Sequence, residues 1–360
     1  MIRMLSKVSV LLVASFLLTK VSTVDSMTIS CLEKKVRHGL SLFGGISGIS
    51  YKENNNWLMV TEGLPLVFPV HLDLREEKLQ PKIGQPIVLT GDPLNNELVK
   101  LESIAYCQNR LIFGTEAING VDLKSKKTQD IRIIITNKSG EYIDDLELPS
   151  YFRRTDHSGT QFYRGIQGLS CSPDGETLLV SIQSPLLQDG NSLLGRHLIY
   201  SWHSETMSFK VEREIAVPID LKLGVMGSTM IDKHRAIILE NENFPKQQNQ
   251  ISLINLKEGS NNLGCFKLSD CNVSSTPKKL LVNNIESYSG VDTTKNEVQY
   301  DSIGVLPVLR SGSLMLLTVN DDDHCGTLRT NPNATIAPGF AGTTFTRIML
   351  PETINSKIKK

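Results

Sequence analysis

The chain has no excess of charge of either sign. Its 360 residues include 38 lysines and arginines against 38 aspartates and glutamates, so the formal net charge at pH 7 is zero. Proteins that bind nucleic acid through its phosphates carry a basic excess or a basic patch. We therefore expect no nucleic-acid partner.

Long apolar runs are also scarce. Val8–Leu18 is the one candidate, and it is too short to cross a bilayer comfortably as a helix. Arg3 and Lys7 precede it and a polar stretch follows, a combination typical of a secretory signal peptide. We interpret residues 1–26 as that signal and residues 27–360 as a single domain, with an uncleaved membrane anchor as the alternative. We expect a secreted or periplasmic protein without stable membrane insertion after cleavage.

Cysteine occurs six times but never in a CxxC pair, and no cysteine–histidine spacing suggests a zinc site. An even number of cysteines in an exported chain allows three disulfides. Cys265 and Cys271 flank a short polar loop and are the best pair. Cys107 and Cys171 lie in strand-like segments, where buried free thiols are an alternative to a disulfide.

Helical periodicity is absent as well, because no window shows a sustained apolar repeat of about 3.6 residues. Short runs rich in β-branched or aromatic residues alternate with turn sequences such as Asn-Lys-Ser-Gly at 137–140 and Ser-Pro-Asp-Gly at 172–175. Such runs predict strands. Outside the N-terminal segment we expect an all-β protein.

One sequence pattern recurs five times: a turn of small residues, followed by an apolar strand that ends in an acidic or amide residue. The copies are WLMVTE to Glu62, RLIFGTE to Glu116, TLLVSIQ to Gln183, RAIILENE to Glu240 and Glu242, and LMLLTVND to Asp321. They are roughly 50 to 80 residues apart, enough for about four strands each, which is typical of propeller blades. We predict a β-propeller with five blades, or six if the long interval before the last copy holds another. Residues 28–39 are expected to supply the fourth strand of the last blade.

Acidic residues stand at equivalent positions of these repeats. Equivalent loops of a propeller converge at one end of its channel, so residues far apart in sequence become neighbours there. Several carboxylates in one funnel repel each other unless a cation lies among them, and hard oxygen ligands favour calcium. The predicted ligands are Glu62, Glu102, Glu116, Glu240 and Asp321, with Gln167, Glu242, Asp322 and Asp323 at related positions. The alternative is that these are strand-end acids facing solvent.

Eight short motifs follow one another along residues 43–350. In order they are GISGISY, WLMVTE, LESIAY, LIFGTEA, RGIQGLSCSPDGETL, AIILENENF, YDSIGVL and LLTVNDDD. This order resembles that of the phytase-like esterase family, exported propellers described as having esterase-like activity of phytase. The resemblance implies a calcium-dependent hydrolase in which Glu102, Glu116, Glu240 and Asp321 match acids of the family.

The sequence departs from the family pattern at several of these positions. Gln167 and Ser302 stand where the family carries glutamate, Asn241 replaces an arginine, and Glu62 replaces an aspartate. Calcium affinity follows the charge of the ligands, so these changes imply a weaker site. They motivate an alternative function, that of a non-catalytic secreted propeller that binds a ligand or a protein partner on the same face.

Two arginines complete the predicted site. Arg132 and Arg196 open the third strands of the second and third repeats, where the family also tends to carry arginine. A guanidinium can bind phosphoryl oxygens in a bidentate manner, so Glu102, Glu116, Arg132 and Arg196 are the predicted catalytic residues. A salt bridge to a neighbouring blade is the alternative for each arginine. We favour an enzyme, expected to be a monomer, that hydrolyses small-molecule phosphate esters or related esters.

Overall fold

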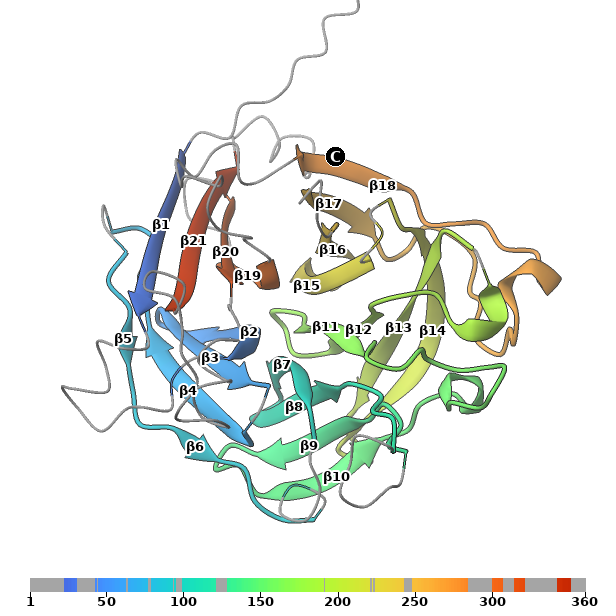
Figure 1. Cartoon of the computed structure of the whole chain (residues 1–360), viewed down its shortest axis with the longest axis horizontal. Coiled ribbons are helices and arrows are strands. Elements are labelled where there is room, and N and C mark those ends of the chain that lie inside the picture. The colour runs from blue at the N-terminus through green and yellow to red at the C-terminus, as the bar shows by residue number, and fades with distance from the viewer. Residues whose placement is uncertain are drawn as a thin grey trace, which may run out of the picture.

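Five antiparallel sheets are arranged around a central axis in the computed structural model of the chain (Figure 1). The structure describes residues 23–30, 43–283, 300–306, 314–320 and 342–350. Within 43–283 it leaves out 44, 63, 77–78, 93, 95–98, 121–127, 191, 221, 223 and 243–247. Among these residues the only helical elements are single 3-10 turns at Ser150–Phe152, Leu187–Asp189 and Leu268–Asp270. The expected all-β class is confirmed.

Each sheet is one blade. In four of the five blades, the strands follow one another in chain order from the channel outward. Blade 1 contains β2 (Ile46–Glu53), β3 (Asn56–Thr61) and β4 (Leu66–His71), with the short β5 (Lys82–Ile83) and β6 (Ile87–Val88) on β4. Blade 2 contains β7 (Leu101–Cys107), β8 (Arg110–Thr115), β9 (Ile133–Asn137) and β10 (Tyr142–Leu146). Blade 3 contains β11 (Ile166–Cys171), β12 (Thr177–Ile182), β13 (Leu194–His203) and β14 (Ser208–Pro218). Blade 4 contains β15 (Gly224–Asp232), β16 (Arg235–Asn241), β17 (Asn249–Asn255) and β18 (Lys278–Asn283).

Blade 5 joins the two ends of the described chain. It contains β19 (Tyr300–Leu306), β20 (Leu314–Asn320), β21 (Gly342–Leu350) and, outermost, β1 (Thr23–Ser30). β1 pairs with β21 from Thr23 opposite Met349 to Ser30 opposite Gly342. An N-terminal strand therefore completes the last blade as expected, but it begins before the predicted segment 28–39. Residues 28–30 of that segment lie in the strand, and residues 31–39 lie outside the described residues. Residues 23–26 of this strand precede the predicted cleavage point.

The inner strands close the ring at five blades. β2 contacts β7, β7 contacts β11, β11 contacts β15, β15 contacts β19, and β19 returns to β2. Because β19 packs directly against β15, the inner strands that the structure describes leave no place for a sixth blade between blades 4 and 5. The five-blade prediction is confirmed.

Small residues let neighbouring blades approach closely. A Cβ added to Gly48 would lie 2.8 Å from the Cα of Ser103, so blade 1 meets blade 2 backbone against backbone. Serine hydroxyls then bind across the boundaries: Ser47 Oγ donates to Leu101 O at 2.5 Å, and Ser103 Oγ donates to Ile166 O at 2.5 Å. Apolar side chains such as Trp57 and Phe113 fill the space between the sheets. The inner strands are thereby held in a fixed register around the channel.

Two disulfides lie within the described residues. Cys265–Cys271 closes the loop between β17 and β18, as predicted. Cys107–Cys171 links the ends of β7 and β11 with a Cα–Cα distance of 5.7 Å, so the free-thiol alternative for these two residues is wrong. Cys31 and Cys325 lie outside the described residues. Disulfides are typical of proteins in oxidising compartments.

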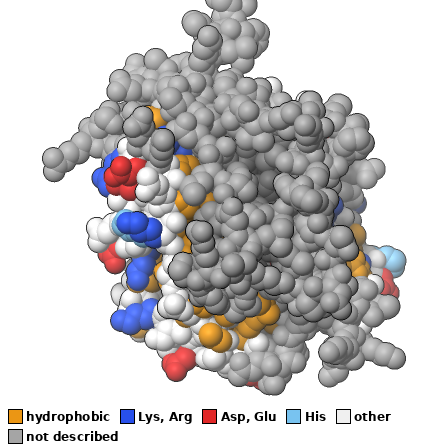
Figure 2. All heavy atoms as spheres, turned by 60° about the vertical axis from the view of Figure 1, so that its left-hand side comes forward, with side chains coloured by type: hydrophobic (Ala, Val, Ile, Leu, Met, Phe, Trp, Pro, Cys, Tyr) orange, Lys and Arg blue, Asp and Glu red, His pale blue; other side chains and the backbone are white. Residues whose placement is uncertain are grey.

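The described surface mixes both signs of charge. Figure 2 shows lysine and arginine side chains interspersed with aspartate and glutamate on the described part of one face. A search of the described residues also finds no helix that is long and apolar enough to span a membrane.

Candidate functional site

A β-bulge occurs at the same point in the first strand of every blade. The pairing with the second strand skips one residue there, and the skipped residues are Ser47, Glu102, Gln167, Met226 and Asp301. This register corrects one sequence assignment. Asp301, and not Ser302, occupies the position equivalent to Glu102 and Gln167. Blade 5 therefore retains an acidic residue at this position.

A second set of equivalent residues follows the second strand of each blade. The backbone N–H of Glu62 donates to Gly45 O, that of Glu116 to Lys100 O, and that of Gln183 to Gly165 O. In blade 4, Asn241 pairs with Gly224 in the same way. Asn241, and not Glu240, thus occupies this position in blade 4. In blade 5, Asp321 follows β20 in the sequence and lies outside the described residues. Both sets lie at one end of the channel, which we call the acidic mouth.

Three carboxylates meet at the acidic mouth, and we call them the acid triad. Glu62 belongs to blade 1, and Glu102 and Glu116 belong to blade 2. Each contributes an oxygen, and these oxygens all lie within 4.8 Å of one another. Glu102 and Glu116 are buried, whereas the Glu62 side chain is 29% exposed. Three of the five predicted ligands are therefore brought together.

The Lys100 ammonium lies among these carboxylates. Its Nζ is 2.7 Å from Glu62 Oε1 and 3.0 Å from Glu116 Oε2. Burial opposes the charged form of Lys100, but the hydrogen bond and charge of Glu62, with those of Glu116, raise its pKa above the usual value. The Lys100 ammonium is thus the partner of the buried Glu116 Oε2. Sequence reasoning did not identify Lys100.

Glu102 is the most strongly perturbed member of the acid triad. Burial, together with the charges of Glu62 and Glu116, raises its pKa to about 8. Gln167 Nε2 donates to Glu102 Oε2 at 2.9 Å, which favours the carboxylate form. The amide of blade 3 therefore supports the buried acid of blade 2 at the place where the family carries another carboxylate.

The donor set of the acid triad fits a divalent cation. All three groups offer hard oxygen ligands, which calcium prefers. One lysine charge opposes three carboxylates, so positive charge is in short supply when all are ionised. Two oxygens bound to the same calcium at about 2.3–2.6 Å lie at most about 5 Å apart, a condition that the acid triad meets.

The acidic mouth is asymmetric. Blades 3 and 4 place Gln167, Gln183, Met226 and Asn241 where blades 1 and 2 place Glu62, Glu102 and Glu116. Gln183 Nε2 lies 3.3 Å from Met226 Sδ across the boundary between blades 3 and 4. The acids thus gather on one side of the mouth and neutral side chains on the other.

Glu240 is not part of the acid triad. It precedes the mouth position by one residue, and successive side chains of a strand point to opposite faces. Its carboxylate lies 2.6 Å from Lys278 Nζ on β18 and accepts a hydrogen bond from the backbone N–H of Asp220. Lys278 also pairs with Asp220 at 2.8 Å. The structure therefore gives Glu240 an ion-pair role within blade 4.

Arg132 lies at the acidic end of blade 2 but does not contact the acid triad. Its backbone exchanges hydrogen bonds with Thr115, the residue before Glu116. Its guanidinium pairs with Asp145 on β10, with 2.6 Å between Nε and Oδ2, and both side chains are about one-third exposed. This is a salt bridge within one blade.

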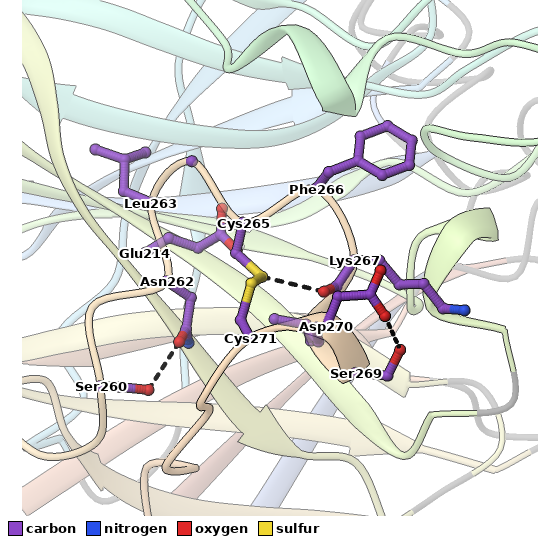
Figure 3. Close-up of a disulfide and its surroundings, with 12 residues drawn as sticks. Glu214, Ser260, Asn262, Leu263, Cys265, Phe266, Lys267, Ser269, Asp270 and Cys271 are labelled. Atoms are coloured by element: carbon purple, nitrogen blue, oxygen red, sulfur yellow. Dashed lines mark hydrogen bonds between the residues drawn. A yellow bond between two sulfur atoms is a disulfide. The ribbon is translucent and has the colours of Figure 1, made fainter.

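Arg196 is enclosed in the protein. Its side chain is fully buried and makes a bidentate pair with Asp189 at 2.7 and 2.8 Å and an ion pair with Glu214 at 2.5 Å. It also donates to the carbonyls of Cys265 and Phe266 in the disulfide loop, beside which Glu214 lies (Figure 3). Each nitrogen of the guanidinium thus donates to a carboxylate or a carbonyl, and Arg196 is not brought to the acidic mouth. Its ion-pair partners lie within blade 3, and not in a neighbouring blade as the salt-bridge alternative expected.

The remaining acidic candidates divide into two groups. Glu242 follows β16, and its carboxylate lies 3.7 Å from Lys222 Nζ. Asp321, Asp322 and Asp323 lie outside the described residues.

A separate cavity of about 320 Å³ lies at the opposite end of the inner strands. It is lined by residues near the ends of those strands, including Tyr51, Lys52, Tyr106, Cys107 and Ile231. None of the acid triad lines it. The chain therefore has two different channel ends, one acidic and one of mixed polarity.

The comparisons with known proteins agree with the family resemblance. A family model described as phytase-like, esterase-like activity of phytase, matches residues 41–324, well over half of the chain. No curated protein gives a significant match.

Three solved structures illustrate the structural similarity. The Dos1 propeller matches with 8% identity and a TM-score of 0.35, over 77% of this chain and 54% of that one, so this chain spans about half of its length. The PQQ-bound aldose sugar dehydrogenase from Streptomyces coelicolor matches with 9% identity and a TM-score of 0.37, over 90% and 98%. A thermostable family-43 glycoside hydrolase matches with 8% identity and a TM-score of 0.43, over 85% and 89%. The five-bladed fold follows from the strand pairing and the closure of the ring of inner strands.

Proposed function

The chain belongs to the phytase-like family with esterase-like activity of phytase, and on that premise we propose that it is an exported, calcium-dependent hydrolase of phosphate esters or related esters. The observation that carries this proposal is the acid triad. Glu62, Glu102 and Glu116 come from two neighbouring blades and place carboxylate oxygens within 4.8 Å of one another at one channel mouth.

The acid triad would hold the cation. Glu102 and Glu116 are fixed by their strands, and Glu62 supplies the more exposed carboxylate at the rim. A bound cation supplies positive charge against substrate oxygens and makes water a better nucleophile at neutral pH. Gln167 would hold Glu102 in place through its hydrogen bond, since a ligand needs a fixed orientation to bind well.

The two predicted arginines differ in what they can contribute. The Arg132 pair with Asp145 is partly exposed, and such pairs are worth about 0–1 kcal/mol, so Arg132 can exchange Asp145 for a substrate anion. Arg196 cannot do this without leaving Asp189 and Glu214 buried and unpaired. We therefore retain Arg132 as an outer anion contact and assign Arg196 to the stability of blade 3.

Export is supported by two observations. The N-terminal segment has the pattern of a signal peptide, and the two disulfides within the described residues are typical of extracellular proteins. We propose secretion or a periplasmic location.

A non-catalytic binding function is the second candidate, and the asymmetry of the acidic mouth favours it. Blades 3 and 4 offer Gln167, Gln183 and Asn241 at positions where added carboxylates would strengthen a cation site. A mouth with fewer charged ligands can still bind a polar ligand or a protein partner.

A hydrolysis panel separates the two functions. The mature protein would be assayed with p-nitrophenyl phosphate, bis(p-nitrophenyl) phosphate and p-nitrophenyl acetate, each in calcium and in chelator. Turnover that requires calcium on any of the three supports the hydrolase. No turnover on all three, together with saturable binding of an intact ester in calcium, would support the binding function instead.

A further inference from the structure

Lys100 is an exception within the repeat. Its carbonyl accepts the hydrogen bond from Glu116, and the equivalent carbonyls in blades 1 and 3 belong to Gly45 and Gly165. Gly224 occupies the same pairing position in blade 4. This position is described in four blades: three have glycine, and blade 2 has the positively charged side chain of Lys100.

That charge lies where a cation would bind. Lys100 Nζ contacts Glu62 Oε1 at 2.7 Å and Glu116 Oε2 at 3.0 Å. A calcium ion held by the acid triad needs oxygens of these same two carboxylates, at about 2.3–2.6 Å. An ammonium and a divalent cation that share the same oxygens at such distances exclude each other by volume and by charge repulsion.

The Lys100 side chain is exposed and flexible enough to move away from the acid triad. Its side chain is 32% exposed, and its stem has four flexible carbons. The buried Arg196 shows the opposite arrangement, with no exposed surface and a carboxylate or carbonyl partner on every side. Lys100 can exchange its carboxylate partners for water at the rim, and Arg196 cannot.

We propose that the Lys100 ammonium is a built-in counter-ion of the acid triad and that binding of a divalent cation displaces it toward the rim of the acidic mouth. This inference rests on the proposed function, because the cation is the one assigned there. Without the cation, the lysine offsets the repulsion between Glu62 and Glu116. With the cation bound, the released ammonium becomes a positive group at the mouth for an anionic ester. Lys100 then serves as a substrate-binding residue in addition to Arg132.

Calcium titration calorimetry on three proteins tests the displacement. They are the wild type, Lys100→Met, and the matched control Lys52→Met, which removes a lysine at the opposite channel end. Loss of the competing charge should raise the calcium affinity of Lys100→Met by roughly tenfold or more, because affinity follows the net charge of the site. The affinity of Lys52→Met should equal that of the wild type.

The outcomes separate this inference from the proposed function. Equal calcium affinity in the wild type and Lys100→Met, or weaker binding in Lys100→Met, would overturn the displacement and leave the cation site standing. Absence of calcium binding in both proteins would overturn the displacement and the calcium site together. Calcium binding is measured here without any substrate, so a failure to find hydrolysis does not affect the result.

A second measurement keeps the test independent of the variant, which leaves acids unpaired and can fail to fold. The wild type would be acetylated on its lysines for a short time, with calcium and with chelator, and each site quantified by mass spectrometry. Acetylation of Lys100 should increase several-fold in calcium, and that of Lys52 should not change. No increase at Lys100 at saturating calcium would contradict the displacement.

Discussion

Gln167 Nε2 donates a hydrogen bond to the buried carboxylate of Glu102 across the boundary between blades 2 and 3, at 2.9 Å. Both residues occupy the β-bulge of their strands, so the contact is between equivalent positions of neighbouring repeats. An amide at this point stabilises Glu102 where a carboxylate would repel it. Compared with a glutamate, the amide offers a cation one charged ligand fewer and adds no carboxylate beside Glu102.

Gln167→Glu should destabilise the cation-free protein and increase its stabilisation by calcium. Above about pH 8, where Glu102 is ionised, the new carboxylate would repel it at hydrogen-bond distance. The melting temperature in chelator should therefore fall, and calcium should raise it by more than in the wild type. Thermal unfolding with and without calcium measures both effects. Gln80→Glu, in an exposed loop, is the control and should change neither value. A variant that melts like the wild type in chelator would show that Glu102 does not depend on the amide.

Arg196→Met should unfold easily but bind calcium normally. It leaves Asp189 and Glu214 buried without their partner, and breaking a buried pair costs about 3–5 kcal/mol. Arg132→Met removes a partly exposed pair and should cost less than about 1 kcal/mol. Urea unfolding of the two variants measures the difference. A loss below about 1 kcal/mol for Arg196→Met would contradict the structural role assigned to that residue.

His197 should make the protein sensitive to mild acid. The side chain is fully buried on β13, with Nδ1 2.8 Å from Ser181 Oγ, and burial, with a smaller effect of Lys278, lowers its pKa from 6.5 to about 3. The unfolded chain takes up this proton below about pH 6.5 and the folded chain does not. The stabilisation is therefore complete above pH 6.5 and is lost as the pH falls toward 3, by at most about 1.4 kcal/mol per unit.

His197→Asn removes the titration and keeps a polar group near Ser181. Its urea-unfolding free energy should fall less steeply between pH 6.5 and 4 than that of the wild type, whatever its absolute value. His157→Asn, at an exposed loop position, is the control and should retain the wild-type slope. Identical slopes for all three proteins would mean that His197 does not control the acid response.

The two disulfides should differ in their contribution to stability. Cys107–Cys171 spans 64 residues, and Cys265–Cys271 spans 6. In the chain-entropy account these loops correspond to about 4 and about 2 kcal/mol. Removing the first pair by double alanine substitution should therefore lower the unfolding free energy more than removing the second. The reverse order would show that contacts of the loop around Cys265, and not chain entropy, decide the ranking.

The propeller could be predicted from sequence because its signal is repeated. Strand-ending acids such as Glu62 and Glu116 recur in register, and the repeat gave both the blade and the end of the channel at which these residues meet. Blade number needed the structure, since only the packing of β19 on β15 shows that the ring of inner strands closes with five blades.

The site could be predicted only in part, because a strand changes face at every residue. Glu240 was expected at the acidic mouth, but Asn241 occupies that position, and Glu240 pairs with Lys278 instead. The β-bulge likewise shifts the register of β19, so that Asp301, and not Ser302 as expected, occupies the position equivalent to Glu102. Lys100 had a signal that alignment of the repeats could have revealed: it stands where three other blades have glycine.

The most direct test of the acid triad as a catalytic cation site is turnover of p-nitrophenyl phosphate, or of the panel ester that gives the highest rate, by the wild type and Glu102→Gln/Glu116→Gln. Glu53→Gln, an exposed substitution at the other end of β2, is the matched control. We predict calcium-dependent turnover in the wild type and in Glu53→Gln. The double variant should lose more than about 100-fold, since even outer-shell partners of a metal cost about 10–100-fold. Equal turnover in all three proteins, or turnover that persists in chelator, would contradict the account.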